Sequence, residues 1–209
     1  MHRLHLLFAN ALPAILDFGV GALLAVSVTH WLGGEMQVWT WLLGGVLALV
    51  PDFDVIPSVL RGQSTPFDHH QTLFHRPVIT ISFASVLCYL LLGSNWALIA
   101  VACVTWHFLH DTGWLKRNTG IAWLWPLSDK FLSWYGLYEI QAHVEHHVWL
   151  RRYWTQPTLV SVVEITVGLG ALSLALYEQQ LGWPWLLLFP LTGLSLTVYV
   201  WMVKHSARW

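Results

Sequence analysis

The sequence predicts an all-α fold: a polytopic membrane helix bundle of about six transmembrane helices plus an interfacial amphipathic segment. The first observation behind this prediction is composition. Only 10% of the 209 residues are charged and 56% are hydrophobic, whereas soluble domains carry about 25% charged residues. The second is a series of long apolar stretches, and the third is the placement of the basic residues. We expect residues 1–209 to form a single membrane-embedded domain.

Six apolar stretches approach the length of about 20 residues that a spanning helix needs. They cover residues 11–32, 38–51, 77–93, 95–111, 157–178 and 184–203. The first lacks a small-residue cleavage site and contains Asp17, so we interpret it as a retained helix and not as a signal peptide. Residues 112–156 mix tryptophan, tyrosine, histidine and charge. They are expected to lie along the membrane surface as an amphipathic helix.

The basic residues all fall on one face of this arrangement. They are Arg3, Arg61, Arg76, Lys116, Arg117, Lys130, Arg151, Arg152, Lys204 and Arg208. The positive-inside rule makes that face cytoplasmic, which predicts a multi-pass inner-membrane protein with both termini inside. Of the 12 histidines, all except His30 lie at or near the same face. The net charge of −1 gives no reason to expect a nucleic-acid partner.

Two segments on this face combine carboxylates with imidazoles. In "PDFD", Asp52 and Asp54 follow Pro51, which disfavours a helix interior, and the two carboxylates can point at one cation from an extended turn. In "FDHHQTLFHR", His70 and His75 are candidate ligands, and His69 is a candidate proton carrier because imidazole titrates near neutral pH. The alternatives are a hydrated span end for the first segment and a solvated loop for the second.

Two helical segments add further candidates. In "TWHFLHDTG", His107 and Asp111 are four residues apart and share a helix face, which suits chelation of a divalent metal, while His110 could orient a ligand or act as one. The alternative is an interfacial His–Asp hydrogen bond. In "YEIQAHVEHH", a stripe of ionisable residues is either a solvated helix face or a further source of ligands and a general base. This stripe comprises Glu139, His143 and His147.

Carboxylate oxygens mixed with imidazole suit zinc, with manganese or iron as alternatives. The number of candidate ligands predicts two or three divalent ions. A metal ion lowers the pKa of water towards neutrality and clamps phosphate oxygens, which suits hydrolysis of a phosphoester.

Four segments, in matching order and spacing, resemble the membrane-bound metal-dependent hydrolases, a bacterial and archaeal inner-membrane family typified by a LexA-regulated protein. The segments are "PDFD" at 51–54, "HQTLFHR" at 70–76, "HFLHD" at 107–111 and "GIAWLWPLS" at 120–128. The resemblance implies hydrolase chemistry without specifying a substrate. Gln71, Thr72, Arg76 and His110 depart from the family pattern, but the candidate ligands remain.

A more distant likeness is to zinc-dependent phospholipase C enzymes, which bind three zinc ions. Under that likeness Asp54, His70 and the His107–Asp111 pair match the first ligand elements. His143 and His147 would replace the last pair, with histidine in place of a carboxylate.

We therefore predict a hydrolase that acts on a phosphoester of a phospholipid or related lipid at the cytoplasmic interface. The predicted metal ligands are Asp52, Asp54, His70, His75, His107, Asp111, His143 and His147. The predicted catalytic groups are Glu139, His110 and His69, and the predicted contacts to lipid phosphate are Arg76, Lys116 and Lys130. The oligomeric state does not follow from the sequence.

Two other function classes stay open. A membrane di-iron oxygenase or desaturase would use histidine boxes such as "HVEHH", although the "PDFD" turn has no role there. A non-enzymatic metal transporter would place ligands along a path in the membrane. Asp17 and Glu164 are the acidic residues well inside predicted spans. If they lined a path, transport would be favoured, but we expect each to pair with a neighbour in the bundle.

Overall fold

The chain is predominantly helical in the computed structural model, which describes residues 2–54, 56, 69–112, 120–133, 136–138 and 159–179. For residues 2–13, 69, 136–138 and 159–162 it describes the backbone alone. The α-helices are α1 (His2–Trp31), α2 (Thr40–Ala48), α4 (Pro77–Leu92), α5 (Ser94–Asp111) and α7 (Leu159–Glu178). Short 3₁₀ helices η1 (Val50–Asp54), η2 (His69–Gln71) and η3 (Leu73–His75) connect α2 to α4. Within the described residues, these helices coincide with the first five apolar stretches, and residues 184–203 lie outside them.

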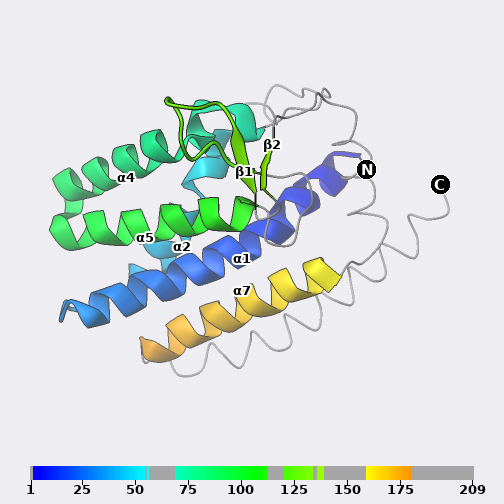
Figure 1. The fold of residues 1–209 in the computed structure, drawn as a ribbon. Coiled ribbons are helices and arrows are strands. Elements are labelled where there is room, and N and C mark those ends of the chain that lie inside the picture. Colours follow the sequence, from blue (N-terminus) through cyan, green and yellow to red (C-terminus); the bar gives the residue numbers. More distant parts are fainter. Residues whose placement is uncertain are drawn as a thin grey trace.

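Helix α1 is the centre of the bundle. It packs against α7, α2 and α5, and α4 packs on the far side of α5 (Figure 1). The main apolar core lies between α1, α2, α4 and α5. It includes Ala25, Ala48, Cys103, Val104 and Phe108. This core reaches the end of α5 at Phe108, so the last turn of α5 is held firmly against its neighbours.

Small residues let α7 approach the backbone of α1. A Cβ atom on Gly19 of α1 would overlap the carbonyl oxygen of Gly168 in α7. In the other direction, a Cβ atom on Gly168 would lie 2.5 Å from the carbonyl oxygen of Ile15. Close backbone approach between small residues is a common way for membrane helices to pack. It brings the polar residues of α1 and α7 within reach of α5.

Helices α4 and α5 form an antiparallel pair with a very short connection. Pro77 begins α4, where its fixed φ suits the first turn and its missing N–H is not needed. Gly93 joins the two helices with a φ of 94°, a conformation that side chains with a Cβ rarely adopt. The tight reversal brings the start of α4, which follows His75, next to the end of α5.

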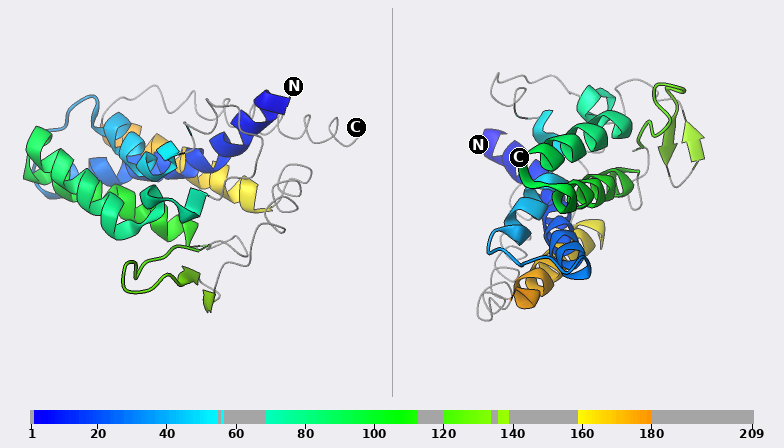
Figure 2. Two further views of the ribbon diagram at one scale, coloured as in Figure 1. Left: turned by 90° about the horizontal axis from the view of Figure 1, so that it is seen from above. Right: turned by 90° about the vertical axis from the view of Figure 1, so that its left-hand side faces the viewer.

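The segment after α5 differs from the prediction. Residues 112–156 were expected to form an amphipathic helix, but the described part contains turns and an antiparallel hairpin of β1 (Phe131–Ser133) and β2 (Gly136–Tyr138). Pro126 disfavours a continuous helix, and the buried–exposed–buried alternation of β1 has the period of a strand. Ile121 also pairs with Leu132. Figure 2 shows this hairpin outside the helix bundle, beside α4 and α5.

Within the described residues, Ala14–Trp31 is long and apolar enough to cross a membrane, with a mean hydropathy of 1.5. Pro77–Leu92 is apolar but shorter. The helical fold class is therefore confirmed, whereas the number of six spans stays a prediction.

Candidate metal centre

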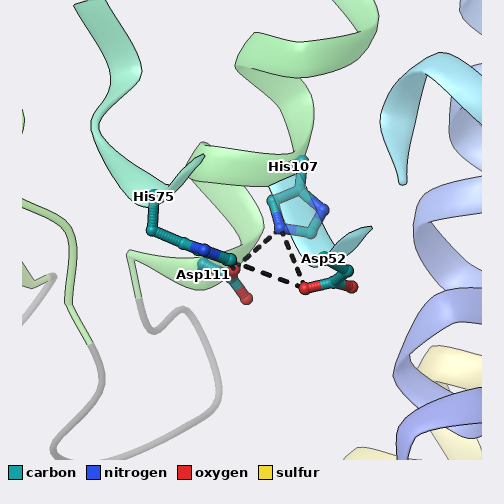
Figure 3. A group of neighbouring side chains, drawn as sticks. All are labelled: Asp52, His75, His107 and Asp111. Carbon is teal, nitrogen blue, oxygen red and sulfur yellow. Dashed lines mark ion pairs between the residues drawn. The ribbon is translucent and has the colours of Figure 1, made fainter. Parts of the chain in front are cut away.

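Four ionisable side chains from three separate segments meet at one end of the bundle. Asp52 comes from η1, His75 from η3, and His107 and Asp111 from the last turns of α5. One potential ligand atom from each residue lies within 4.8 Å of the others. Figure 3 shows the four side chains turned towards one another. We refer to these four residues as the metal cluster.

The local structure explains why each side chain reaches this point. Pro51 and the short η1 helix turn the chain after α2, so that Asp52 is presented at the end of the core. His107 and Asp111 are one helical turn apart and therefore face the same direction. The ring of Phe108 packs edge-on against the rings of both His75 and His107, with centroids 6.2 and 5.8 Å away. This packing holds the two imidazoles side by side.

The atoms of the metal cluster have the spacing of a ligand set. His107 Nε2 lies 3.0 Å from Asp111 Oδ2 and 3.6 Å from Asp52 Oδ1. His75 Nε2 lies 3.6 Å from Asp52 Oδ1 and 3.7 Å from Asp111 Oδ2. Tetrahedral zinc with bonds of about 2.0–2.2 Å has ligand atoms about 3.4 Å apart. The four measured distances lie around that value.

The other ring nitrogen of each histidine in the metal cluster faces a carboxylate. His75 Nδ1 lies 3.2 Å from Asp54 Oδ2, which also accepts a hydrogen bond from the Thr72 hydroxyl. His107 Nδ1 lies 3.4 Å from Asp17 Oδ2. A histidine that binds metal through one nitrogen commonly presents the other to a carboxylate. Asp54 and Asp17 therefore stand behind the histidines, on the side away from the metal cluster.

Buried polar atoms support a cation at this position. Within the described part of the chain, His107 Nε2 and Asp111 Oδ2 make no aligned hydrogen bond although both are buried. Buried polar atoms rarely stay unsatisfied. Two imidazole nitrogens and two carboxylate oxygens form a donor set that suits zinc, manganese or iron. The metal cluster therefore fits a divalent metal ion.

The electrostatics also favour a cation. Burial by itself would lower the pKa of His75, but the carboxylates of Asp111, Asp52 and Asp54 stabilise the charged ring and raise its pKa to about 10. In the metal-free protein, His75 therefore holds a proton at neutral pH.

We expect metal binding to release this proton, because a histidine must be neutral to act as a ligand. The pKa of His75 is raised, so the metal-free ring stays protonated until the pH approaches about 10. Metal affinity should therefore rise with pH, roughly tenfold per unit below that value for one displaced proton. Calorimetric titration with Zn²⁺ in buffers of different ionisation enthalpy measures the protons released. Affinity that does not change between pH 6 and 8 would contradict this expectation.

His70 lies at the edge of the metal cluster. Its Nε2 is 3.7 Å from Asp111 Oδ2, and its ring stacks on that of His75 with centroids 5.2 Å apart. Its Nδ1 lies 3.2 Å from the carbonyl oxygen of Gly120, in the segment that precedes β1. If Nδ1 donates to that carbonyl, Nε2 keeps its lone pair towards Asp111. His70 is thus placed as a ligand for the same ion or for a neighbouring one.

The segment 120–133 packs over this end of the bundle. Besides the contact between Gly120 and His70, the indole of Trp123 donates a 2.8 Å hydrogen bond to the Thr112 hydroxyl at the end of α5. The guanidinium of Arg76, one residue after His75, lies over the rings of Trp125 and Phe131, 6.0 and 5.5 Å from their centroids. These two rings therefore hold the side chain of Arg76 in a defined position. In the sequence, Arg76 directly follows His75 of the metal cluster.

The remaining predicted site residues are distributed differently. His110 is turned away from the metal cluster, towards Asp17 and Glu164. Lys130 is exposed on the segment before β1. The side chain of His69 lies outside the described structure, as do four further predicted residues. These are Lys116, Glu139, His143 and His147.

Asp17 was not among the predicted site residues, although the structure places it directly behind His107. The available signal was an acidic residue inside an apolar span, which usually has a functional or pairing role. The expectation that Asp17 and Glu164 each pair with a neighbour is confirmed, because both contact His110. Their common partner could not be predicted from local spacing, since His110 is 93 residues from Asp17 in the sequence.

The fold and the metal cluster together define a helical bundle with a candidate metal centre at one end. The model of the YdjM inner membrane protein family matches residues 15–205. The chain therefore belongs to this family of inner membrane proteins. No curated protein and no solved structure matches the chain.

Proposed function

We propose that the protein is a membrane-embedded, metal-dependent hydrolase that cleaves a phosphoester of a phospholipid or related lipid at the cytoplasmic interface. The observation that carries this proposal is the metal cluster, with two histidines and two aspartates at ligand spacing and a carboxylate behind each histidine. Membrane location follows from the family, which makes lipid the most accessible substrate class.

A catalytic role is favoured over a purely structural one by the exposure of the metal cluster. The side chains of His75 and His107 are 0% and 1% exposed, whereas that of Asp52 is 29% exposed. The centre is therefore closed on the side of the bundle and open at Asp52. Structural zinc sites are usually fully enclosed, while catalytic ones keep an accessible position.

The residues of the chain have separable roles in this proposal. A divalent metal ion supplies two effects when bound, because it lowers the pKa of water and polarises a phosphoryl oxygen. Asp52, His75, His107 and Asp111 hold it, with His70 available as a further ligand. Arg76 follows the ligand His75 directly in the sequence, and its guanidinium, which lies over Trp125 and Phe131, would pair with a lipid phosphate. Lys130 offers a second, exposed cation for the headgroup.

The two alternative functions, an oxygenase and a metal transporter, predict other metal-ligand sets or other placements of the ligands in the fold. Histidine-box oxygenases rely on many imidazoles, whereas the metal cluster has equal numbers of imidazoles and carboxylates and uses Asp52 from the "PDFD" turn. A transporter would extend its ligands along a path. Asp17 and Glu164 instead contact α5 at His107 and His110, within one turn of each other near the end of that helix.

A lipid-cleavage assay tests the proposal. It uses the purified protein in detergent micelles that contain phosphatidylethanolamine and phosphatidylglycerol. With Zn²⁺ or Mn²⁺ added, we expect release of diacylglycerol or phosphatidic acid, measured by mass spectrometry. Asp52→Asn should reduce the rate by at least about 100-fold, since it removes a ligand charge at the open side of the centre. Cys103→Ala, a buried change one turn before His107, should leave the rate nearly unchanged.

Two results would contradict the hydrolase. One is full metal loading of the folded protein with no cleavage of any phosphoester lipid. The other is a bound pair of iron ions with activity that requires oxygen and a reductant, which would establish the oxygenase instead.

A further inference from the structure

A second group of buried ionisable residues adjoins the metal cluster and comes from three different helices. Asp17 of α1, His110 of α5 and Glu164 of α7 are 2%, 6% and 1% exposed. Removing charged groups from water costs several kcal/mol per ion unless they are paired. We call these three residues the support group. Its burial in an otherwise apolar bundle calls for a physical explanation.

The support group forms a continuous chain of contacts that ends at the metal cluster. His110 lies between the two carboxylates, with Nδ1 3.0 Å from Asp17 Oδ1 and Nε2 3.3 Å from Glu164 Oε1. The ring of Trp106 stacks on His110, with centroids 6.4 Å apart and an interplanar angle of 10°. Asp17 Oδ2 then lies 3.4 Å from His107 Nδ1. The carboxylate of Asp17 thus faces both His110 of the support group and His107 of the metal cluster.

The contact between Asp17 and His107 decides which nitrogen of His107 can bind a metal. The Nδ1 atom is buried, and within the described residues it makes no aligned hydrogen bond. Asp17 Oδ2 lies 3.4 Å from it, at ion-pair distance. An ionised carboxylate can only accept hydrogen bonds, so its position favours an N–H group at Nδ1, which leaves the lone pair on Nε2. Nε2 is the atom that faces Asp52 and Asp111.

His75 provides an internal comparison. Its Nδ1 contacts Asp54, and Asp54 is held in turn by the Thr72 hydroxyl. Around His107, Asp17 takes the place of Asp54, and His110 takes the place of Thr72. The two histidines of the metal cluster therefore share one arrangement, although the supporting residues come from different parts of the chain.

We infer that Asp17 is a positioning residue for His107, and that His110 and Glu164 hold Asp17 in place, so that α1 and α7 help to set the metal affinity. The inference rests on the metal-binding part of the proposed function and is independent of the reaction. It assigns a role to the two acidic residues inside the apolar helices. The competing explanation is a buried ion-pair network that stabilises helix packing without affecting the metal cluster.

Cobalt(II) binding to the full-length protein in detergent separates these explanations, because cobalt reports its ligand geometry in the visible spectrum whereas zinc is spectroscopically silent. Asp17→Asn keeps the size of the side chain but replaces one acceptor oxygen with an NH₂ group. We expect the affinity for Co²⁺ to fall by about 10–100-fold, the usual effect of losing such a partner. The absorption spectrum should change as well. Cys103→Ala, at the α1–α5 contact, is the matched control and should alter neither.

A second variant keeps the test valid if Asp17→Asn fails to fold. Glu164→Gln leaves Asp17 in place and weakens only the far end of the chain of contacts, so it should reduce Co²⁺ affinity by less than tenfold with a smaller spectral change. If both variants lower thermal stability but bind Co²⁺ with wild-type affinity and spectrum, the support group is structural and the inference is wrong.

The outcomes also separate the inference from the hydrolase proposal. Altered Co²⁺ binding in Asp17→Asn, together with a wild-type protein that cleaves no lipid, would uphold the inference and contradict the hydrolase. Lipid cleavage by the wild type, with unchanged Co²⁺ binding in both variants, would contradict the inference alone. A wild-type protein that binds no Co²⁺, Zn²⁺ or Mn²⁺ would overturn both.

Discussion

The double variant His107→Ala/Asp111→Ala is expected to lose its bound metal down to background. The substitutions remove two of the four residues in the metal cluster, including the pair whose Nε2 and Oδ2 atoms lie 3.0 Å apart. Loss of a supporting partner alone costs about 10–100-fold in metal affinity, so loss of two ligands should cost much more. Elemental analysis of the purified full-length protein measures the metal content per chain.

Thermal stability gives a second measure of the same loss. A ligand that binds only the folded state stabilises it by about 2.7 kcal/mol when its concentration is 100 times the Kd. Added Zn²⁺ should therefore raise the Tm of the wild type and of Cys103→Ala, but not that of the double variant. Wild-type metal content in a well-folded double variant would show that the metal lies elsewhere and would rule out the assigned cluster.

A substitution at the contact between α1 and α7 is expected to have a large effect on the free energy of unfolding. Gly168→Ala places a Cβ atom 2.5 Å from the carbonyl oxygen of Ile15, so α7 must move away from α1. Overpacking of this kind usually costs about 1–3 kcal/mol. Glu164 lies one turn before Gly168, so the shift should also disturb its contact with His110. Thermal or denaturant unfolding in detergent measures the free energy of unfolding.

Gly170→Ala is a matched control on the same helix. A Cβ atom at position 170 would meet nothing within 4 Å among the described residues. Alanine favours a helix over glycine by about 1 kcal/mol, so this variant should be unchanged or more stable. The two substitutions are chemically identical and two residues apart, yet only Gly168→Ala should lower stability. Equal effects would mean that α7 does not approach α1 through Gly168.

Much of the metal centre was predictable because its strongest signals are local. A histidine and an aspartate four residues apart must share a helix face, which made the His107–Asp111 pair visible from spacing alone. The dense group of histidines around His75 was unusual in an apolar chain. By contrast, spacing did not show that Asp52 would face the metal cluster while Asp54 stands behind His75. That distinction depends on the turn of η1 relative to α5.

Where the structure differs from the prediction, the causes are similarly specific. The segment after α5 was expected to be helical from its mixture of polar and aromatic residues, but strand pairing between Ile121 and Leu132 and the presence of Pro126 favour turns and a hairpin. The catalytic role of His110 stays a prediction, although its side chain does not face the metal cluster. One step along a helix turns a side chain by about 100°, and this directs His110 towards Asp17 and Glu164 instead.

The positions of the described helices and the residues that offer metal-binding groups follow from the sequence alone, because apolar length and helical spacing are properties of contiguous residues. The tertiary structure decided which atoms converge. Asp52, His75 and His107 meet only because η1 packs against η3 and the end of α5, and Asp17 reaches His107 because α1 packs against α5. Convergence of this kind depends on how closely helices approach, which is set by contacts between residues far apart in the chain.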